Sequence, residues 1–261
     1  MPSGLAWMQT NRTPQPALWL TSFVVGAILI VACGGREAEQ RHVLVSAASS
    51  LTDVFADIEA EFEAKNPTVD VLVNVAGSSL LREQILGGAP IDVFASANPS
   101  IMQTVVEAGL ASGPAIFAGN RLLIGVPTDN PAGVVGLEDF TDSGLFIGLC
   151  AEAVPCGSLA RDVLAAAGVE ASIDTSEPDV RSLLTKLEAG ELDAGIVYAT
   201  DVIASREVTG IEIAATFAPV TDYPIAVITA APNPASARDF VTFVLSTEGQ
   251  DILTRHGFTA P

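Results

Sequence analysis

The chain has little positive charge and few of the side chains that commonly perform catalysis. It contains 12 Lys and Arg against 31 Asp and Glu, only two His and three Cys, and its formal charge is −19. The phosphate backbone of nucleic acid repels such a chain, so nucleic acid is not expected as a partner. Lys65 and Lys186 are the only lysines, which leaves few candidates for Schiff-base or Ser-Lys chemistry.

Enzyme motifs are missing as well. The sequence has no G-x-S-x-G elbow and no S-x-x-K, H-E-x-x-H or P-loop pattern. We interpret both histidines, His42 and His256, as surface residues. The sequence therefore predicts a binding protein rather than an enzyme, with no cofactor and no bare metal ion.

The N-terminus has the pattern of a secretion signal. Residues 17–32 carry no charge, and Arg12 gives the only positive charge before them. These 16 residues are fewer than the roughly 20 that a membrane-spanning helix needs, so an uncleaved signal anchor is the weaker alternative. Ile30-Val31-Ala32-Cys33 resembles the lipobox of bacterial lipoproteins, which implies cleavage after residue 32 and acylation of Cys33.

Removal of residues 1–32 leaves 11 basic and 31 acidic residues, a formal charge of −20, and makes residues 33–40 a polar tether. Acyl chains contribute about 0.8 kcal/mol per buried methylene, so Cys33 would anchor the protein outside the cytoplasm, in the periplasm or on the outer face of the cytoplasmic membrane. Cys150 and Cys156 remain, and such a close pair can be oxidised there. A disulfide between them is therefore predicted.

Apolar runs alternate with amphipathic stretches along the chain, a pattern typical of an α/β fold. Strands are predicted at 42–45, 69–75, 91–95, 121–126, 145–149, 195–198 and 223–228. Helices are predicted at about 51–62, 80–87, 99–109, 155–164, 182–189 and 235–245. The residues after the signal are enough for one large domain or for two small lobes.

Small or hydroxyl residues recur where a predicted strand gives way to a helix. They are Ser49-Ser50, Gly77-Ser78-Ser79, Val154-Pro155-Cys156-Gly157 and Pro178-Asp179-Val180. A helix start leaves N–H groups unpaired and carries partial positive charge, and in open α/β sheets such starts meet outside the carboxyl ends of the strands. Each serine taken singly is better explained as a helix cap, but their repetition favours an anion site.

Seven motifs resemble, in order, those of the periplasmic molybdate-binding proteins of ABC transporters. They are ASSLTD at 48–53, AGSSL at 76–80, PIDVF at 90–94, VPCG at 154–157, DVR at 179–181, GIVY at 195–198 and GFT at 257–259. The resemblance implies a type II periplasmic-binding-protein fold of two α/β lobes, with two crossing strands and the ligand in the cleft between the lobes. Lobe 1 would comprise 41–119 and 223–261, and lobe 2 would comprise 120–222.

The matched positions imply five ligand-binding residues, Ser50, Ser78, Cys156, Val180 and Tyr198. The two serines would donate hydroxyl groups from lobe 1. From lobe 2, Cys156 and Val180 would donate main-chain N–H groups and Tyr198 its phenolic O–H. The family position of Cys156 is often alanine, and a main-chain donor tolerates that change.

A site made only of donors suits an anion that carries no proton. Molybdate, tungstate and sulfate are fully ionised near neutral pH, whereas phosphate keeps a proton and needs an acceptor. None of the five positions is acidic, and Asp53, Asp179 and Asp201 are interpreted as first-turn helix charges. The expected ligand is molybdate or tungstate, and the expected partner is the membrane permease of an ABC importer, with this chain acting as a monomer.

The sequence allows other ligands and functions as well. The same fold could carry sulfate or another tetrahedral oxyanion, since only cavity size separates sulfate from the larger molybdate. A secreted hydrolase with Ser50 or Ser78 as nucleophile would need a base that the sequence does not supply. A sensor domain would share the binding chemistry. If the family motifs were aligned one residue out of register, Ser49 and Ser79 would be selected in place of Ser50 and Ser78.

Overall fold

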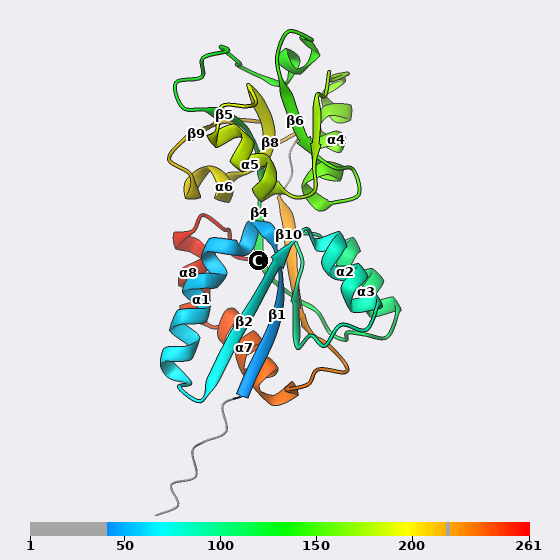
Figure 1. The fold of residues 1–261 in the computed structure, drawn as a ribbon, viewed down its shortest axis with the longest axis vertical. Helices are drawn as coiled ribbons and strands as arrows, with labels where there is room; N and C mark the ends of the chain where they lie inside the picture. Colours follow the sequence, from blue (N-terminus) through cyan, green and yellow to red (C-terminus); the bar gives the residue numbers. More distant parts are fainter. Residues whose placement is uncertain (1–40, 218–219) are drawn as a thin grey trace, which may run out of the picture. The chain divides into compact units, whose positions relative to one another are not determined.

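Two β-sheets, each packed against helices, make up the part of the chain that the structure describes (Figure 1). The structure is a computed structural model, and it describes residues 41–217 and 220–261. The predicted signal at 1–32, the acylation site Cys33 and the tether at 33–40 lie outside the described residues. Within the described ranges, every helix is too short or too polar to cross a membrane.

The first sheet has five strands in the order β2-β1-β3-β10-β4. Their bounds are β1 Arg41–Ala48, β2 Val69–Ala76, β3 Val93–Ala95, β4 Ala115–Asn120 and β10 Thr221–Val227. Strands β2, β1 and β3 pair in parallel, whereas β10 is antiparallel to both β3 and β4. Three parallel strands therefore end at the same edge of this sheet.

Helices cover both faces of the first sheet. They are α1 Thr52–Lys65, α2 Ser78–Leu86, α3 Pro99–Glu107, α7 Pro234–Leu245 and α8 Thr247–Arg255. Helices α1, α7 and α8 bury one apolar cluster, in which Phe55 and Phe62 of α1 meet Phe240 of α7 edge to face. Helices α2 and α3 bury a second cluster, built around Leu81 and Met102. We call this sheet with its helices lobe 1.

The second sheet, with the helices around it, is called lobe 2, and its strand order is β7-β6-β8-β5-β9. The strands are β5 Leu122–Pro127, β6 Ile147–Cys150, β7 Thr175–Glu177, β8 Ala194–Tyr198 and β9 Val208–Glu212. The helices are η2 Leu137–Thr141, α4 Pro155–Ala167, α5 Val180–Glu188 and α6 Ala199–Ala204. Strands β7, β6 and β8 are parallel, and one apolar cluster joins this sheet to α4 and α5.

The chain passes between the sheets twice. Strand β4 ends at Asn120 and β5 begins at Leu122, so a single residue, Arg121, separates them. The return runs from the end of β9 at Glu212 to the start of β10 at Thr221. The lobe boundaries at 119/120 and 222/223 stay a prediction.

The start of α4 depends on a glycine, because a Cβ at Gly157 would overlap the carbonyl oxygen of Ala151. We expect Gly157→Ala to lower the free energy of unfolding by about 1–3 kcal/mol, since the backbone must shift to make room. Urea denaturation measures this change. Gly136→Ala is the control, because a Cβ there meets only the mobile carboxylate of Glu138. Equal stability of the two variants would contradict the prediction.

Candidate functional site

A small pocket lies between the lobes, and all five residues selected from the sequence line it. Its walls are formed by Ala48, Ser49, Ser50, Gly77, Ser78, Ala97, Val154, Pro155, Cys156, Asp179, Val180 and Tyr198. Its cavity volume is about 10 Å³, far below the roughly 300–1,000 Å³ of pockets for drug-sized ligands. The pocket therefore suits a ligand of only a few atoms.

Each of the five residues stands at the carboxyl end of a parallel strand. Ser50 lies in the short helix η1 (Ser49–Leu51) after β1, and Ser78 begins α2 after β2. Cys156 is in the first turn of α4 after β6, Val180 begins α5 after β7, and Tyr198 ends β8. None of the five is more than 9% exposed. The edges of both sheets thus converge on one buried space, as expected for an open α/β sheet.

The serine hydroxyl groups differ in how they are engaged. The oxygen of Ser78 accepts the N–H of Ala97 at 3.1 Å, and the oxygen of Ser50 lies 2.9 Å from the hydroxyl oxygen of Tyr223. Ser79 instead donates its hydroxyl to the carbonyl of Ala153 in lobe 2. The hydroxyl of Ser79 is therefore used between the lobes, whereas that of Ser78 keeps its proton for the pocket.

Two helix starts supply main-chain donors. The N–H groups of Cys156 and Val180 lie in first turns, where a helix has no acceptor of its own to offer. Pro155 takes the first position of α4, where its missing N–H is not needed. Asp179 caps α5 by accepting the N–H of Ser182 at 2.9 Å. Its carboxylate thus serves the helix start from the N-cap position, one residue before the first turn in which the sequence analysis placed it.

Tyr198 contributes a buried hydroxyl without an acceptor. It is 1% exposed, and its hydroxyl group has no hydrogen-bond partner of good geometry among the described residues, although the hydroxyl of Tyr223 is close enough to affect its pKa. Burial removes water from around the phenol and raises the pKa of Tyr198 well above its ordinary value. The group stays protonated and is a donor. Its ring packs edge-on against that of Tyr223, with ring centres 6.0 Å apart.

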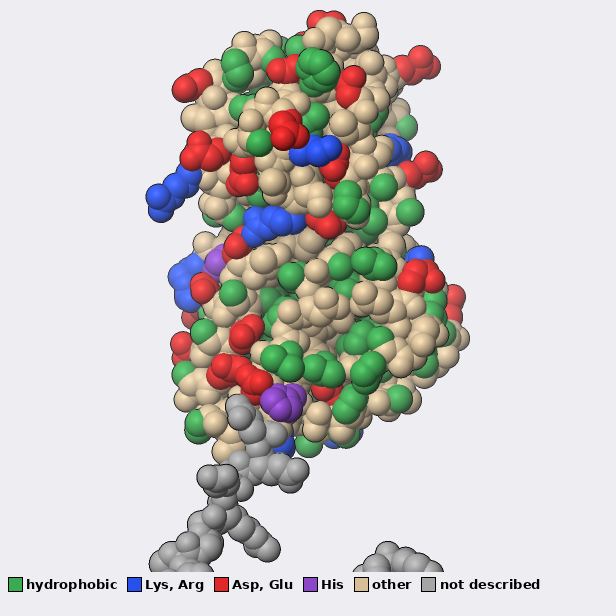
Figure 2. All heavy atoms as spheres, viewed as in Figure 1, with side chains coloured by type: hydrophobic (Ala, Val, Ile, Leu, Met, Phe, Trp, Pro, Cys, Tyr) green, Lys and Arg blue, Asp and Glu red, His purple; other side chains and the backbone are tan. Residues whose placement is uncertain are grey.

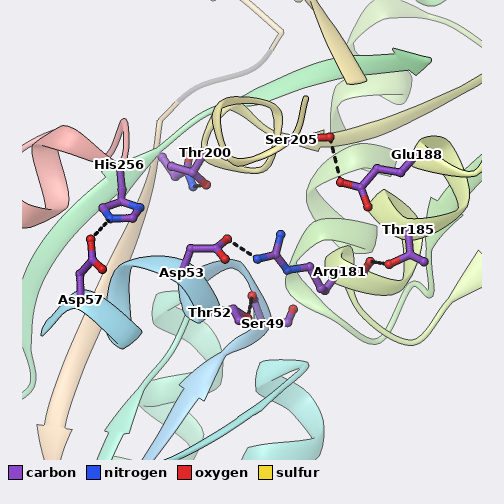
Figure 3. Close-up of polar contacts among 11 residues, drawn as sticks. Ser49, Thr52, Asp53, Asp57, Arg181, Thr185, Glu188, Thr200, Ser205 and His256 are labelled. Carbon is purple, nitrogen blue, oxygen red and sulfur yellow. Dashed lines mark hydrogen bonds and ion pairs between the residues drawn. The ribbon is translucent and has the colours of Figure 1, made fainter. Parts of the chain in front are cut away.

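No basic side chain lines the pocket. The nearest arginine in sequence to the pocket wall, Arg181, forms an ion pair with Asp53 of the other lobe (Figure 3). On the face seen in Figure 2, acidic side chains are spread over the surface and outnumber basic ones. Any negative charge in the pocket would thus be held by hydroxyl and N–H groups alone.

The lobes are in direct contact around the pocket. A Cβ on Gly77 would lie 3.0 Å from the carbonyl oxygen of Pro178 and 3.3 Å from the side chain of Val154. Asn120 donates to the hydroxyl of Thr200 at 2.9 Å and to that of Tyr223 at 3.4 Å. Sequence reasoning selected neither Asn120 nor Tyr223. The one available signal was that a buried tyrosine on a predicted strand needs a hydrogen-bond partner.

A disulfide joins Cys150 at the end of β6 to Cys156 in α4, with Cα atoms 5.8 Å apart. It links the strand to the helix start that supplies one of the main-chain donors. Among the described residues, no group of three or more His, Cys, Asp or Glu is arranged to hold a metal ion.

Asp201 lies behind Tyr198. It is 2% exposed, and its carboxylate accepts the N–H of Tyr198 at 3.0 Å, which caps α6. Burial opposes the charged form and raises the pKa of Asp201 to about 7, even though the N–H of Tyr198 favours the charge. The prediction of a first-turn helix residue is confirmed, and burial makes its charge depend on pH.

Comparison with known proteins gives consistent results. Residues 43–259 match the family model of bacterial extracellular solute-binding proteins. The molybdate-binding protein of Mycobacterium tuberculosis is 37% identical over 256 residues, which cover 93% of this chain and 98% of that protein. That of Escherichia coli is 32% identical over 92% of this chain and 98% of its own length. A Bacillus subtilis protein described as an ABC transporter substrate-binding lipoprotein is 26% identical, with coverages of 92% and 95%.

Solved structures share the fold. The periplasmic molybdate-binding protein of Azotobacter vinelandii has a TM-score of 0.73 at 18% identity, covering 84% of this chain and 99% of that one. The sulfate-binding protein of Mycobacterium tuberculosis has a TM-score of 0.75 at 16% identity, with coverages of 84% and 87%. The predicted two-lobe α/β fold is thereby confirmed. Since both proteins have it, the fold alone does not select between their anions.

The disulfide generates one prediction. Replacing both Cys150 and Cys156 with Ala should lower the free energy of unfolding by about 2 kcal/mol, because the unfolded chain loses a closed loop. Urea denaturation measures the loss, and adding reductant to the unchanged protein should reproduce it while leaving the double variant unaffected. Two titratable thiols at these positions in the denatured, unreduced protein would contradict the disulfide.

Asp201 generates a second prediction. Between the pKa of an unfolded Asp, about 3.9, and about 7, the folded protein holds a proton that the unfolded chain has released. The free energy of unfolding should therefore fall as pH rises through this range and should level off above it. Asp201→Asn should remove the contribution of Asp201 to this decrease in the free energy of unfolding, whereas the exposed control Glu212→Gln should retain it. Denaturation curves with equal pH dependence in the wild type and Asp201→Asn would contradict the assignment.

Proposed function

The chain belongs to the bacterial extracellular solute-binding proteins, and on that premise we propose that it captures molybdate or tungstate and delivers it to an ABC importer. Relatives of 37% and 32% identity, matched over nearly their whole length, are molybdate-binding proteins. The five pocket residues are those that the resemblance to this family selects. We assign them as the ligand-binding residues.

The observation that carries the proposal is a buried pocket whose polar groups are almost all donors. The hydroxyl groups of Ser78 and Tyr198 have protons that no described residue accepts. The helix starts at Cys156 and Val180 add main-chain N–H groups. A fully ionised tetrahedral anion has oxygen acceptors on every side and no proton to place. Molybdate, tungstate and sulfate meet that requirement, whereas phosphate carries a proton.

The donors are numerous enough for tight binding. A hydrogen bond to a charged group contributes about 1.5–3 kcal/mol, so five of them provide about 7–15 kcal/mol before the costs of ordering and closure. A dissociation constant of about 1 µM corresponds to about 8 kcal/mol. Affinity in or below the micromolar range is therefore within reach without a cationic side chain.

Location and assembly follow from the same assignment. We propose that residues 1–32 are removed, that Cys33 is acylated and that the protein acts as a monomer outside the cytoplasm, held by the tether at 33–40. The Bacillus subtilis relative described as a lipoprotein supports the anchor. The membrane permease of the importer is the proposed protein partner, and the proposed lobes are 41–119 with 223–261 and 120–222.

Hydrolysis is disfavoured by the positions of the histidines. His42 pairs with Asp70 and His256 pairs with Asp57, and neither has a hydrogen bond with Ser50 or Ser78 (His256 in Figure 3). A serine nucleophile at either position would lack a base. We therefore propose a binding role without catalysis.

The proposal predicts the selectivity of the pocket. Calorimetric titration of the purified protein with molybdate, tungstate, sulfate and phosphate should show the tightest binding for the first two and the weakest for phosphate. Ser50→Ala and Ser78→Ala should each weaken molybdate binding by about 1–3 kcal/mol, because each removes a donor to a charged ligand.

Ser100→Ala serves as the matched control. Ser100 is an exposed serine in the first turn of α3, outside the pocket, and its loss should leave molybdate affinity unchanged. If the Ser50→Ala/Ser78→Ala double variant binds molybdate as tightly as the unchanged protein, the assigned site is wrong. If sulfate binds most tightly, the site stands and the ligand must be revised.

A further inference from the structure

A second buried tyrosine, Tyr223, lies outside the pocket wall but next to two of the assigned ligand residues, Ser50 and Tyr198. Tyr223 lies on β10, is fully buried, and its hydroxyl oxygen is 2.9 Å from that of Ser50. A hydroxyl group can donate or accept, so this distance alone does not say which of the two donates. The direction has to come from the groups around the pair.

Asn120 sets that direction. The main-chain N–H of Arg121 donates to the side-chain oxygen of Asn120 at 2.9 Å, so the opposite side of the amide must be its NH₂ group. That NH₂ donates to Thr200 at 2.9 Å and to the hydroxyl oxygen of Tyr223 at 3.4 Å. An amide NH₂ cannot accept, so the oxygen of Tyr223 is the acceptor in this contact.

The proton of Tyr223 then needs an acceptor of its own. Among the described residues, the oxygen of Ser50 is the acceptor within hydrogen-bond distance of this buried hydroxyl. A chain of donors results, from the Asn120 amide to Tyr223 and from Tyr223 to Ser50. The oxygen of Ser50 accepts the Tyr223 proton on the side away from the pocket. The hydroxyl proton of Ser50 can then point into the pocket.

Ser78 shows the same arrangement by a simpler route. The N–H of Ala97, which can only donate, occupies the oxygen of Ser78 at 3.1 Å. The two serines assigned to the ligand, Ser50 and Ser78, thus both accept a hydrogen bond from the protein and are left as donors toward the pocket. The two cases differ in one respect: the direction at Ser78 is set by the backbone, and that at Ser50 by side chains that can be changed.

We propose that Tyr223 is a positioning residue that fixes Ser50 as a donor and so makes the pocket discriminate against anions that carry a proton. A hydrogenphosphate ion must place its O–H against an acceptor, and with Ser50 and Ser78 both held as donors it meets protons on the side of lobe 1. The carboxylate in the pocket wall, that of Asp179, already accepts the N–H of Ser182. Without the Tyr223 hydroxyl, Ser50 can turn and accept that proton. The inference rests on the proposed function and adds the origin of its selectivity.

The test compares the only two tyrosines of the chain, Tyr223 and Tyr198. Affinities of the purified protein for molybdate and for inorganic phosphate are measured by calorimetry, with phosphate measured by competition where binding is weak. Tyr223→Phe should weaken molybdate binding about tenfold and phosphate binding less, so that the ratio of the two affinities falls. Tyr198→Phe removes a direct donor without freeing Ser50, and should weaken both anions while leaving their ratio unchanged.

A double-mutant cycle on molybdate alone gives an independent readout. If Tyr223 acts through Ser50, the variant Ser50→Ala/Tyr223→Phe should bind molybdate as Ser50→Ala does. Asn120→Ala removes the first donor of the chain, the amide that donates to Tyr223. It should also lower the ratio of the molybdate affinity to the phosphate affinity. This variant keeps the experiment decisive if Tyr223→Phe fails to fold, which circular dichroism would show.

Two results would overturn the inference. One is a Tyr223→Phe protein whose molybdate-to-phosphate ratio equals that of the unchanged protein. The other is a double variant that loses affinity by the product of the two single factors, which would show that Tyr223 and Ser50 act separately. An unchanged protein that binds none of the oxyanions would instead refute the proposed function. If it binds sulfate rather than molybdate, the same comparison is made with sulfate, which also carries no proton.

Discussion

The arrangement of this protein depends on hydrogen-bond donors that are buried together at the pocket and that the described residues leave largely without acceptors. A buried polar group without a partner costs about 1–3 kcal/mol, so each such group in the pocket destabilises the empty, closed state. The hydroxyl of Tyr198 is the clearest case, because it is buried and lacks a partner among the described residues. Only a guest with acceptors on several sides relieves the whole set. The fold creates this condition because parallel strands of both sheets end at the pocket, and each is followed by a helix start or a hydroxyl group.

The strongly negative charge of the chain is compatible with this role, because the acidic groups nearest the pocket are already engaged. Asp53 is paired with Arg181 across the lobes (Figure 3). Asp179 accepts the N–H of Ser182 at the start of α5. Burial raises the pKa of Asp201 to about 7 and so disfavours its charged form. More distant surface charges are screened over about 8–10 Å. Donors in direct contact therefore dominate the interaction energy of a bound anion.

Strong periodicity explains which parts of the fold the sequence predicted. Helix α1 places Val54, Phe55, Ile58 and Phe62 on one face, and β1 is a short apolar run, so both were predicted near their observed bounds. Strand β7 is three residues long and polar, and α8 has only two buried apolar residues, Ile252 and Leu253, so neither had a clear pattern. Both were missed, as were β4 and β9, whose short runs resemble connecting segments.

The pocket residues could be predicted from the sequence, whereas Tyr223 and Asn120, which contact them from outside the pocket, could not. Helix starts and their small residues are local features, so a motif of a few residues is enough to select Ser50 or Val180. The partner of Ser50 is Tyr223, which is 173 positions away, and its direction depends on Asn120 at the first crossing. No periodicity or spacing brings these three together. Only the return of the chain through β10 does, and that is a property of the folded topology.

The contacts between the lobes bear on how the proposed ligand would be held and released. The apolar clusters are confined to single lobes, two in lobe 1 and one in lobe 2 among the described residues. Contacts between the lobes include polar ones, such as Ser79 with Ala153 and Arg181 with Asp53, and one aromatic pair, Tyr198 with Tyr223. Opening the lobes would leave every apolar core intact and would return these polar groups to water, where their hydrogen bonds are replaced at little net cost. On the proposed function, a ligand bound to donors on both sides would add bonds that favour closure, and its loss would remove them.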